Sequence, residues 1–241
     1  MDNLSRNVIA EAVGTFLLIA LMVTVATIGP GIIPAALTYG FATAALVAAL
    51  GHVSGGHFNP AITLAYLLSR QIDILAAVAY WIAQFLGAAA GALAIMLIAD
   101  GDVVTAATPV FLEENVSVTG AVIAEAMATF VLVLVILGTV VDQRAPSSVY
   151  PMAIGISVTA GFFAIAPLTG GAMNPARGFG PAVVSGEWDG VAAWLGGPLI
   201  GAVLAWALYR FAVSGGDSPI RDSSGNRSHV LPPPPGSSLL P

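Results

Sequence analysis

Two copies of one tripeptide carry the residues best placed to do chemistry in this chain. The copies are Asn59-Pro60-Ala61 and Asn174-Pro175-Ala176. Asparagine is a strong helix N-cap and proline is favoured at the first helical position, so each motif predicts a helix start. If each asparagine oxygen caps its own helix, the amide NH₂ is left as a donor. Two such starts meeting head to head would favour an oxygen lone pair and oppose cations, because both positive helix dipole ends converge.

Three charged residues lie in otherwise apolar surroundings. Arg177 follows the second motif, and we expect it to line a water-filled path, since burying a charge in lipid is costly. Glu11 and Glu125 should be paired for the same reason, and we expect them to brace nearby loops through hydrogen bonds. His52 and His57 have no carboxylate at ligand-like spacing, so the sequence predicts no metal site. We expect no cofactor, and no nucleophile–base pair is visible, so no catalytic residue is predicted.

The composition indicates that these residues belong to an integral membrane protein. Of the 241 residues, 57% are apolar or aromatic and only 8% are charged, with a mean hydropathy of +0.91. Soluble domains average about 25% charged residues, so most soluble enzymes are excluded. The absence of cysteine excludes disulfides and thiolate zinc sites. Seven basic residues, all arginine, against 13 acidic ones predict no nucleic-acid partner.

Six stretches approach the roughly 20 apolar residues that a transmembrane helix needs. They are residues 8–28, 35–51, 74–99, 119–141, 149–166 and 191–213. None shows the alternation of barrel strands, so an all-α membrane protein is expected. Arginines 6, 70, 144, 210, 221 and 227 would then share one side, which the positive-inside rule assigns to the cytoplasm together with both termini. Residues 214–241, rich in Gly, Ser and Pro, predict a disordered cytoplasmic tail.

The chain also repeats itself. Glu11–Phe16 recurs as Glu125–Phe130 after 114 positions, and Ser54–Ala61 recurs as Thr169–Ala176 after 115 positions. Each copy contains three predicted spans, an odd number, so the second copy must be inserted upside down relative to the first. This 3+3 arrangement is an inverted repeat, whose functional site is expected near the membrane midplane where the two halves meet.

A short segment lies between the second and third spans of each half. Asn59–Leu68 and Asn174–Val184 would reach only about 15 Å as helices, half of a membrane. We therefore expect two re-entrant half-helices that enter from opposite sides and meet at the centre. Residues 1–213 are predicted to form one domain, with repeats at about 7–100 and 121–213. Glycines predict close helix packing at positions 87, 91, 197 and 201.

Taken together, these motifs resemble those of the aquaporin, or major intrinsic protein, family. The resemblance covers roughly residues 7–213. It includes both Asn-Pro-Ala motifs, Gly51–Gly56, Ala83-Gln84, the two repeat glutamates and Asn174–Gly180. It implies six tilted transmembrane helices, two half-helices, a pore in every subunit and a homotetramer. We expect a multi-pass protein of the plasma membrane.

The resemblance also implies an outer constriction, the selectivity filter, carried over by spacing from the two asparagines. Its four members would be Tyr39, Phe162, Gly171 and Arg177. Water channels of the family usually have histidine where Phe162 stands, and glycerol facilitators usually have glycine. Two aromatic rings predict a narrow opening, to which Gly171 would give back some width. A ladder of backbone carbonyls would replace hydration in the pore, formed by Gly55, Gly56, His57, Phe58, Gly170, Gly171, Ala172 and Met173.

We therefore expect passive conduction of water in single file, with Asn59 and Asn174 orienting the central water so that protons and ions are excluded. The alternative is a facilitator of glycerol or another small neutral solute. Gly197 lies only 23 positions after Asn174, without the longer insertion typical of glycerol facilitators. A structural junction protein would lose the pore polarity that this chain keeps. An ion-coupled transporter would need an unpaired acid in the short segments.

Overall fold

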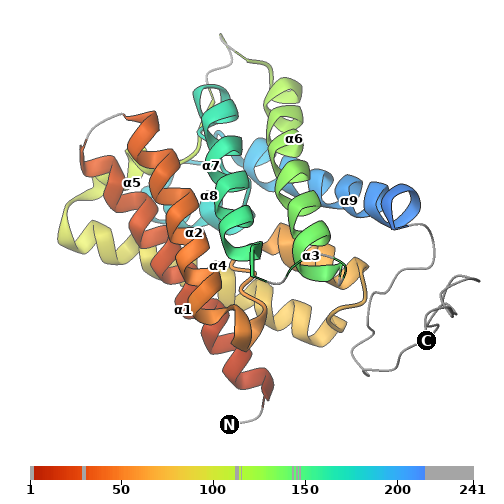
Figure 1. The fold of residues 1–241 in the computed structure, drawn as a ribbon. Coiled ribbons are helices and arrows are strands. Elements are labelled where there is room, and N and C mark those ends of the chain that lie inside the picture. The colour runs from red at the N-terminus through yellow and green to blue at the C-terminus, as the bar shows by residue number, and fades with distance from the viewer. Residues whose placement is uncertain are drawn as a thin grey trace, which may run out of the picture.

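The structure is a computed structural model that describes residues 3–28, 31–111, 114, 116–142, 144, 146 and 148–214. Within these ranges the chain forms helices and no strand (Figure 1). In order, these are α1 (Asn3–Thr24), the 3₁₀ turn η1 (Val25–Ile28), α2 (Ile32–Ser54), α3 (Pro60–Leu68), α4 (Ile74–Ile98), α5 (Gly101–Ala107), α6 (Val118–Ile136), the π-helical turn η2 (Leu137–Val141), α7 (Tyr150–Thr169), α8 (Pro175–Ser185), the π-helical turn η3 (Ala192–Gly196), α9 (Gly197–Leu208) and the π-helical turn η4 (Tyr209–Val213). The tail predicted for residues 214–241 lies outside the described residues, apart from Ser214.

The six predicted spans are confirmed, with shifted ends. Helical segments long and apolar enough to cross a membrane run over Asn3–Thr27, Ile32–Ser54, Ile74–Ile98, Val118–Val141, Tyr150–Thr169 and Ala192–Val213. The second begins before Pro34, since proline is tolerated in a first turn whose N–H groups have no helical partner. The fifth continues past Pro167 for less than one turn, to Thr169.

One helix was not expected from the sequence. α5 lies in the connection between α4 and α6, and its N-cap is Asp100, whose carboxylate accepts from the N–H groups of Asp102 and Val103 at 3.0 and 3.2 Å. An aspartate before a short apolar run is the local signal that could have predicted it. At seven residues the helix is too short for hydrophobic periodicity to reveal it.

The two halves are built from matched helix pairs. α1 packs against α4, and α6 packs in the same way against α9. The predicted close packing at glycines is confirmed. A Cβ on Gly91 would lie 2.5 Å from the Phe16 carbonyl oxygen, and one on Gly201 would lie 2.2 Å from that of Ala126. The helix backbones therefore touch at these crossings, as small residues allow in membrane proteins.

A third crossing joins the two halves to each other. α2 packs against α7, and a Cβ on Gly40 would lie 2.5 Å from the Gly155 carbonyl oxygen. A Cβ on Gly155 would lie equally close to the carbonyl oxygen of Gly40. These glycines stand 115 positions apart, so they are equivalent in the repeat. The crossing holds Tyr39 on α2 near Phe162 on α7, with ring centroids 6.0 Å apart.

Polar and apolar side chains are distributed as a membrane protein requires. Glu11, Gln84 and Glu125 are fully buried, whereas Leu97 and Ile98 are more than three-quarters exposed. In water the outer apolar surface would be unfavourable, but hydrocarbon tails or a neighbouring subunit can cover it. Buried polar groups need hydrogen-bond partners, so the interior must supply them.

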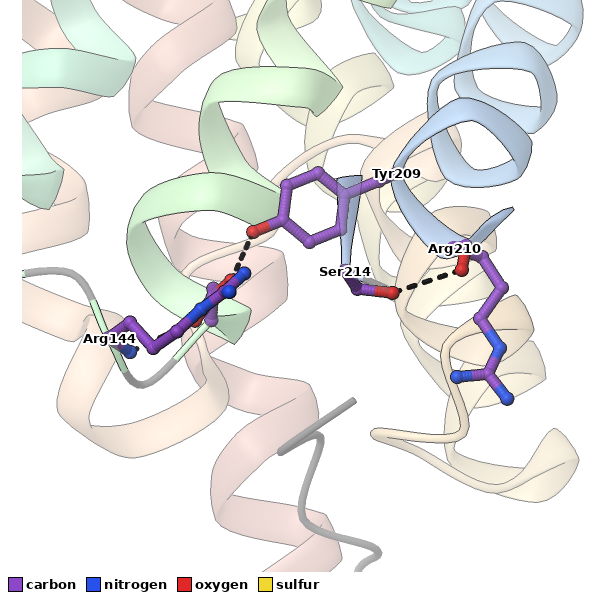
Figure 2. Close-up of polar contacts among 5 residues, drawn as sticks. Arg144, Tyr209, Arg210 and Ser214 are labelled. Carbon is purple, nitrogen blue, oxygen red and sulfur yellow. Dashed lines mark hydrogen bonds and ion pairs between the residues drawn. The ribbon is translucent and has the colours of Figure 1, made fainter. Parts of the chain in front are cut away.

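A polar cluster joins the ends of two helical segments at one end of the bundle. The Tyr209 hydroxyl in η4 and the Arg144 guanidinium both donate to the carboxylate of Asp142, which directly follows η2 (Figure 2). Figure 2 also shows the Arg210 side chain pointing away from this cluster. The hydrogen bonds from Arg144 chiefly, and from Tyr209, hold the pKa of Asp142 well below its usual range even though burial opposes them.

We predict that Tyr209→Phe lowers the free energy of unfolding by about 1.5–3 kcal/mol, the typical contribution of a hydrogen bond to a charged group. Since the pKa of Asp142 is depressed, this contribution is present above the unfolded pKa of about 3.9 and is lost only as pH falls below it. Thermal unfolding in detergent should therefore give the same difference between wild type and variant at pH 5 and pH 8. Tyr150→Phe is the control, because no described residue hydrogen-bonds to the Tyr150 hydroxyl. A difference that changes across this pH range would contradict the prediction.

Candidate functional site

Both Asn-Pro-Ala motifs begin helices, as predicted. The Asn59 side-chain oxygen accepts from the Ala61 N–H at 2.8 Å at the start of α3. The Asn174 oxygen accepts from the N–H groups of Ala176 at 2.9 Å and Arg177 at 3.4 Å at the start of α8. Pro60 and Pro175 occupy the first helical position of each, where a missing N–H costs nothing. Helices of nine and 11 residues cannot cross a membrane alone.

The two helix starts are joined by an exchange of hydrogen bonds. The Asn59 amide nitrogen donates to the Met173 carbonyl oxygen at 2.9 Å, and the Asn174 amide nitrogen donates to that of Phe58 at 2.9 Å. Each asparagine thus binds the residue that precedes the other asparagine. The sequence predicts that both N–H groups of each amide point outward, but one of the two is used inside the protein. A side-chain amide has two N–H groups, so one donor per asparagine remains.

Glu11 binds the segment that precedes the first motif. Its carboxylate accepts from the N–H groups of His57 at 2.9 Å and Phe58 at 2.7 Å, from the Ser54 hydroxyl at 2.6 Å and from the Gln84 amide at 2.8 Å. These contacts connect α1 and α4 to the loop between α2 and α3. A fully buried carboxylate is stable only when its oxygens are satisfied in this way.

Glu125 repeats the arrangement in the second half with one donor fewer among the described residues. It accepts from the Thr169 hydroxyl at 2.6 Å and from the N–H groups of Ala172 at 2.8 Å and Met173 at 2.6 Å. The position equivalent to Gln84, 114 residues later, is Pro198, which has no side-chain donor. Each glutamate thus hydrogen-bonds to the loop that precedes an Asn-Pro-Ala motif, which is the contact expected of a residue that braces this loop.

The two loops share an unusual backbone. Positive φ angles occur at Gly55, Gly56 and Phe58, and again 115 positions later at Gly170, Gly171 and Met173. Glycine adopts such angles without cost, but Phe58 at 47° and Met173 at 51° are strained, by about 1–3 kcal/mol each. Both strained residues donate their N–H to a glutamate and offer their C=O to an asparagine. These hydrogen bonds to the glutamates and asparagines therefore stabilise the strained backbone conformation of Phe58 and Met173.

Three of the predicted constriction residues lie in contact. The Tyr39 and Phe162 rings meet edge to face at 87°, and a Cβ on Gly171 would lie 2.8 Å from the Phe162 ring. The ring thus fills the space beside Gly171, so the missing side chain gives back no width at this point. The Tyr39 hydroxyl donates to the Ala172 carbonyl oxygen at 2.8 Å.

Arg177 completes the predicted quartet and is 5% exposed. Its Nη1 donates to the Ala107 carbonyl oxygen at 3.1 Å and its Nη2 to that of Gly170 at 3.3 Å. Nε has no partner among the described residues, and Arg177 forms no ion pair within them. Ala107 is the last residue of α5. This helix, which the sequence does not predict, therefore supplies one of the two carbonyl oxygens that bind the Arg177 guanidinium.

A cavity of about 430 Å³ opens beside the constriction. Its lining combines the end of α1 and η1, the start of α2, α5 and the end of α7. Polar groups come from Thr108, Gly170 and Arg177, while Met22 and Val25 contribute to a largely apolar wall. Such a volume accommodates small molecules and leads directly to the Phe162 ring.

The His57 side chain belongs to the scaffold. Its Nδ1 lies 3.0 Å from the Thr63 hydroxyl, which also accepts from the Gln84 amide, and its ring packs 4.1 Å from that of Tyr66. No described residue donates to the carbonyl oxygens of Gly55, Gly56 and His57. The carbonyls of this loop are therefore available while its histidine ring is not.

This geometry agrees with the comparison to known proteins. Residues 1–209 match the family model described as major intrinsic protein. The chain belongs to the major intrinsic protein family. It is 39% identical over 196 residues to probable aquaporin TIP2-2 of Oryza sativa subsp. japonica, and the aligned region covers 80% of this chain and 77% of that one. It is 33% identical over 236 residues to nodulin-26 of Glycine max, covering 93% and 84% respectively.

A solved structure shares the fold. The chain superposes on the aquaglyceroporin from Plasmodium falciparum with a TM-score of 0.76, at 24% identity, over 87% of this chain and 97% of that one. The expected architecture of six spans and two half-helices is thereby confirmed. As a member of this family, the chain is a multi-pass membrane channel and not an enzyme.

We predict that Glu125→Gln lowers the free energy of unfolding by about 1–3 kcal/mol, since an amide nitrogen would replace an oxygen that accepts a buried N–H. Both carboxylate oxygens accept a backbone N–H, so neither orientation of the amide avoids the clash of donors. Thermal unfolding in detergent measures the loss. Glu114→Gln is the control, because Glu114 is exposed. Equal stability of both variants would show that Glu125 does not brace the loop.

Proposed function

We propose that this channel conducts water passively in single file. The observation that carries the proposal is the meeting of the two half-helices, where Asn59 and Asn174 each commit one N–H to the opposite loop and retain the other. A water molecule at this point accepts two hydrogen bonds and is thereby oriented. It cannot then relay a proton along the file, because both lone pairs are engaged.

Backbone carbonyls replace the hydration shell along the rest of the path. The rows are residues 55–58 and 170–173, held by the two glutamates. The backbone holds these acceptors in fixed positions. They replace the hydrogen bonds that a water molecule loses when it leaves bulk water, as in other selective pores. The N–H groups of residues 57, 58, 172 and 173 are bound by carboxylates, and those of Gly56 and Gly171 by hydroxyl groups. The carbonyls therefore supply the acceptors of the proposed path, since each carbonyl oxygen has two lone pairs.

Selectivity is assigned to Tyr39, Phe162, Gly171 and Arg177. The two rings in contact narrow the opening, and the space beside Gly171 is filled by Phe162, which supports passage of water over glycerol. Arg177 supplies a positive charge with no ion-pair partner in the described chain, and two helix N-termini add to it. Together they oppose cations. The mostly apolar cavity outside the constriction supports the alternative, a solute with a carbon skeleton such as glycerol.

The protein is proposed to lie in the plasma membrane with both termini in the cytoplasm. Arg144 belongs to the cluster that joins η2 to η4, and Arg210 directly follows Tyr209 of that cluster, so the two arginines share one end of the bundle (Figure 2). The positive-inside rule assigns this end to the cytoplasm. A homotetramer is proposed from the family resemblance. The exposed apolar faces of its helices are compatible with subunit contacts as well as with lipid.

If water is the solute, proteoliposomes carrying the wild-type protein should shrink faster than empty vesicles in an osmotic stopped-flow experiment. Glycerol uptake should remain near that of empty vesicles, because the contact between the Tyr39 and Phe162 rings narrows the constriction. Equal shrinkage with and without protein would refute the channel. Rapid uptake of glycerol would establish the alternative.

We predict that Phe162→Gly raises the glycerol permeability by about tenfold or more, the scale on which a site discriminates by fit. Water permeability should change much less, since water already passes. Phe163→Gly is the matched control, because Phe163 is the next residue of α7 but lies 38% exposed on its outer side. Both variants carry the same helix penalty of about 1 kcal/mol for glycine. If the two variants conduct glycerol equally, Phe162 does not limit the opening.

A further inference from the structure

The cavity beside the constriction contains one charged group whose hydrogen-bond donors are only partly used. Among the described residues that line the cavity, Arg177 is the only one with a charged side chain. A guanidinium has five N–H groups, and Arg177 donates two of them, to the carbonyl oxygens of Ala107 and Gly170. The remaining three make no hydrogen bond to a described residue, and the side chain forms no ion pair within the described chain. This charge therefore retains the capacity to bind an anion.

The rest of the cavity wall is mostly apolar and carries no negative charge. No described residue that lines the cavity is an aspartate or a glutamate. Its larger apolar side chains are those of Met22, Val25, Ile32, Phe162 and Pro167. An apolar wall binds the hydrocarbon part of a ligand, and a guanidinium binds a carboxylate through two parallel hydrogen bonds. The cavity is thus chemically complementary to a small anion with an apolar body.

This combination occurs in only one half of the repeat within the described chain. The position equivalent to Arg177, 115 residues earlier, is Ile62, and the position equivalent to Phe162 is Val47. Both residues are buried in one hydrophobic cluster. Isoleucine has no donor for an anion, so the first half does not repeat the site.

We propose that this cavity is an inhibitory binding site for small carboxylates with an apolar body. The carboxylate accepts hydrogen bonds from the Arg177 guanidinium, and the hydrocarbon part lies against the apolar wall. The cavity volume of about 430 Å³ lies within the range of about 300–1,000 Å³ that is usual for small-molecule sites. The proposal rests on the proposed water path, because a ligand bound beside the constriction obstructs that path.

The ligand is expected to stay in the cavity and not to pass through. The Tyr39 and Phe162 rings meet edge to face and narrow the constriction, and Phe162 also lines the cavity. The positive charge of Arg177 attracts an anion as far as this point, and the rings oppose its further movement. The structure thus combines attraction of a carboxylate with a barrier to its passage.

The test compares benzoate with benzamide, which has the same ring but no charge. Each compound is present at equal concentration inside and outside proteoliposomes at pH 8, so that it creates no osmotic gradient, and water permeability is measured by stopped-flow. We expect benzoate to lower the water permeability toward that of empty vesicles. Half-inhibition by benzamide should need at least about tenfold more compound, the scale of one hydrogen bond to a charged group. Equal potency of the two compounds, or no inhibition by benzoate, would overturn the proposal.

Two neighbouring residues of α5 provide a matched pair of variants. Ala106 lines the cavity and Thr105 does not, and both residues are exposed. Ala106→Asp adds a negative charge to the cavity and should raise the benzoate concentration for half-inhibition by about two- to fivefold. The upper value corresponds to two like charges about 4 Å apart in water. Thr105→Asp adds the same charge outside the cavity and should change this concentration much less, and equal effects of the two variants would contradict the site.

Binding is also measured without conduction, by isothermal titration calorimetry of the full chain in detergent. Benzoate should bind wild type more tightly than Ala106→Asp. If wild type binds benzoate in this way but conducts no water, the proposed function fails and the binding site stands. If wild type conducts water and does not bind benzoate, the site fails alone. Binding that leaves the water permeability unchanged would overturn the inhibitory role.

Discussion

Two buried carboxylates determine the shape of the centre of this molecule. Glu11 and Glu125 each bind two successive backbone N–H groups of a loop, at Phe58 or Met173 and the residue before it. In those loops Phe58 and Met173 adopt positive φ angles, which are unfavourable for residues other than glycine. A carboxylate has two acceptor oxygens and so accepts more N–H groups than any other common side chain, and buried N–H groups without partners would cost more than the strain. The loops, the half-helices and the carbonyl rows all depend on this arrangement.

Much of the scaffold could be predicted because its signals are local. A long apolar run specifies a membrane helix whatever surrounds it, and an Asn-Pro pair specifies a helix start through its own atoms. The glutamates could be recognised because a charge in an apolar run demands partners and because it recurs in the repeat. The sequence predicts that α2 begins after Pro34 and that α7 ends before Pro167, but both helices include the proline, which is tolerated near a helix terminus.

What could not be predicted depends on contacts between distant segments. Asn59 and Asn174 use one amide N–H on each other's loop, and Tyr39 reaches Ala172 across the two halves. No spacing in the sequence reveals such a partner, because it arises only when the helices have packed. The ring of Phe162 beside Gly171 is a further case, because the small residue predicts a wider opening but the neighbouring ring fills the space. Local sequence patterns therefore predict which residues form the site, but they do not predict the hydrogen bonds between these residues.

The contact between Gly40 and Gly155 has a consequence for how the fold could be built. These two residues are equivalent in the repeat and each lies against the backbone of the other. Two separate half-length chains inserted in opposite directions would make the same contact between identical residues, which is the isologous geometry of a two-fold dimer. A glycine on such an axis meets itself, so any larger side chain would be doubled at the point of closest approach. A single chain does not have that constraint, so equivalent positions on the two sides of the axis can differ, as Gln84 and Pro198 do.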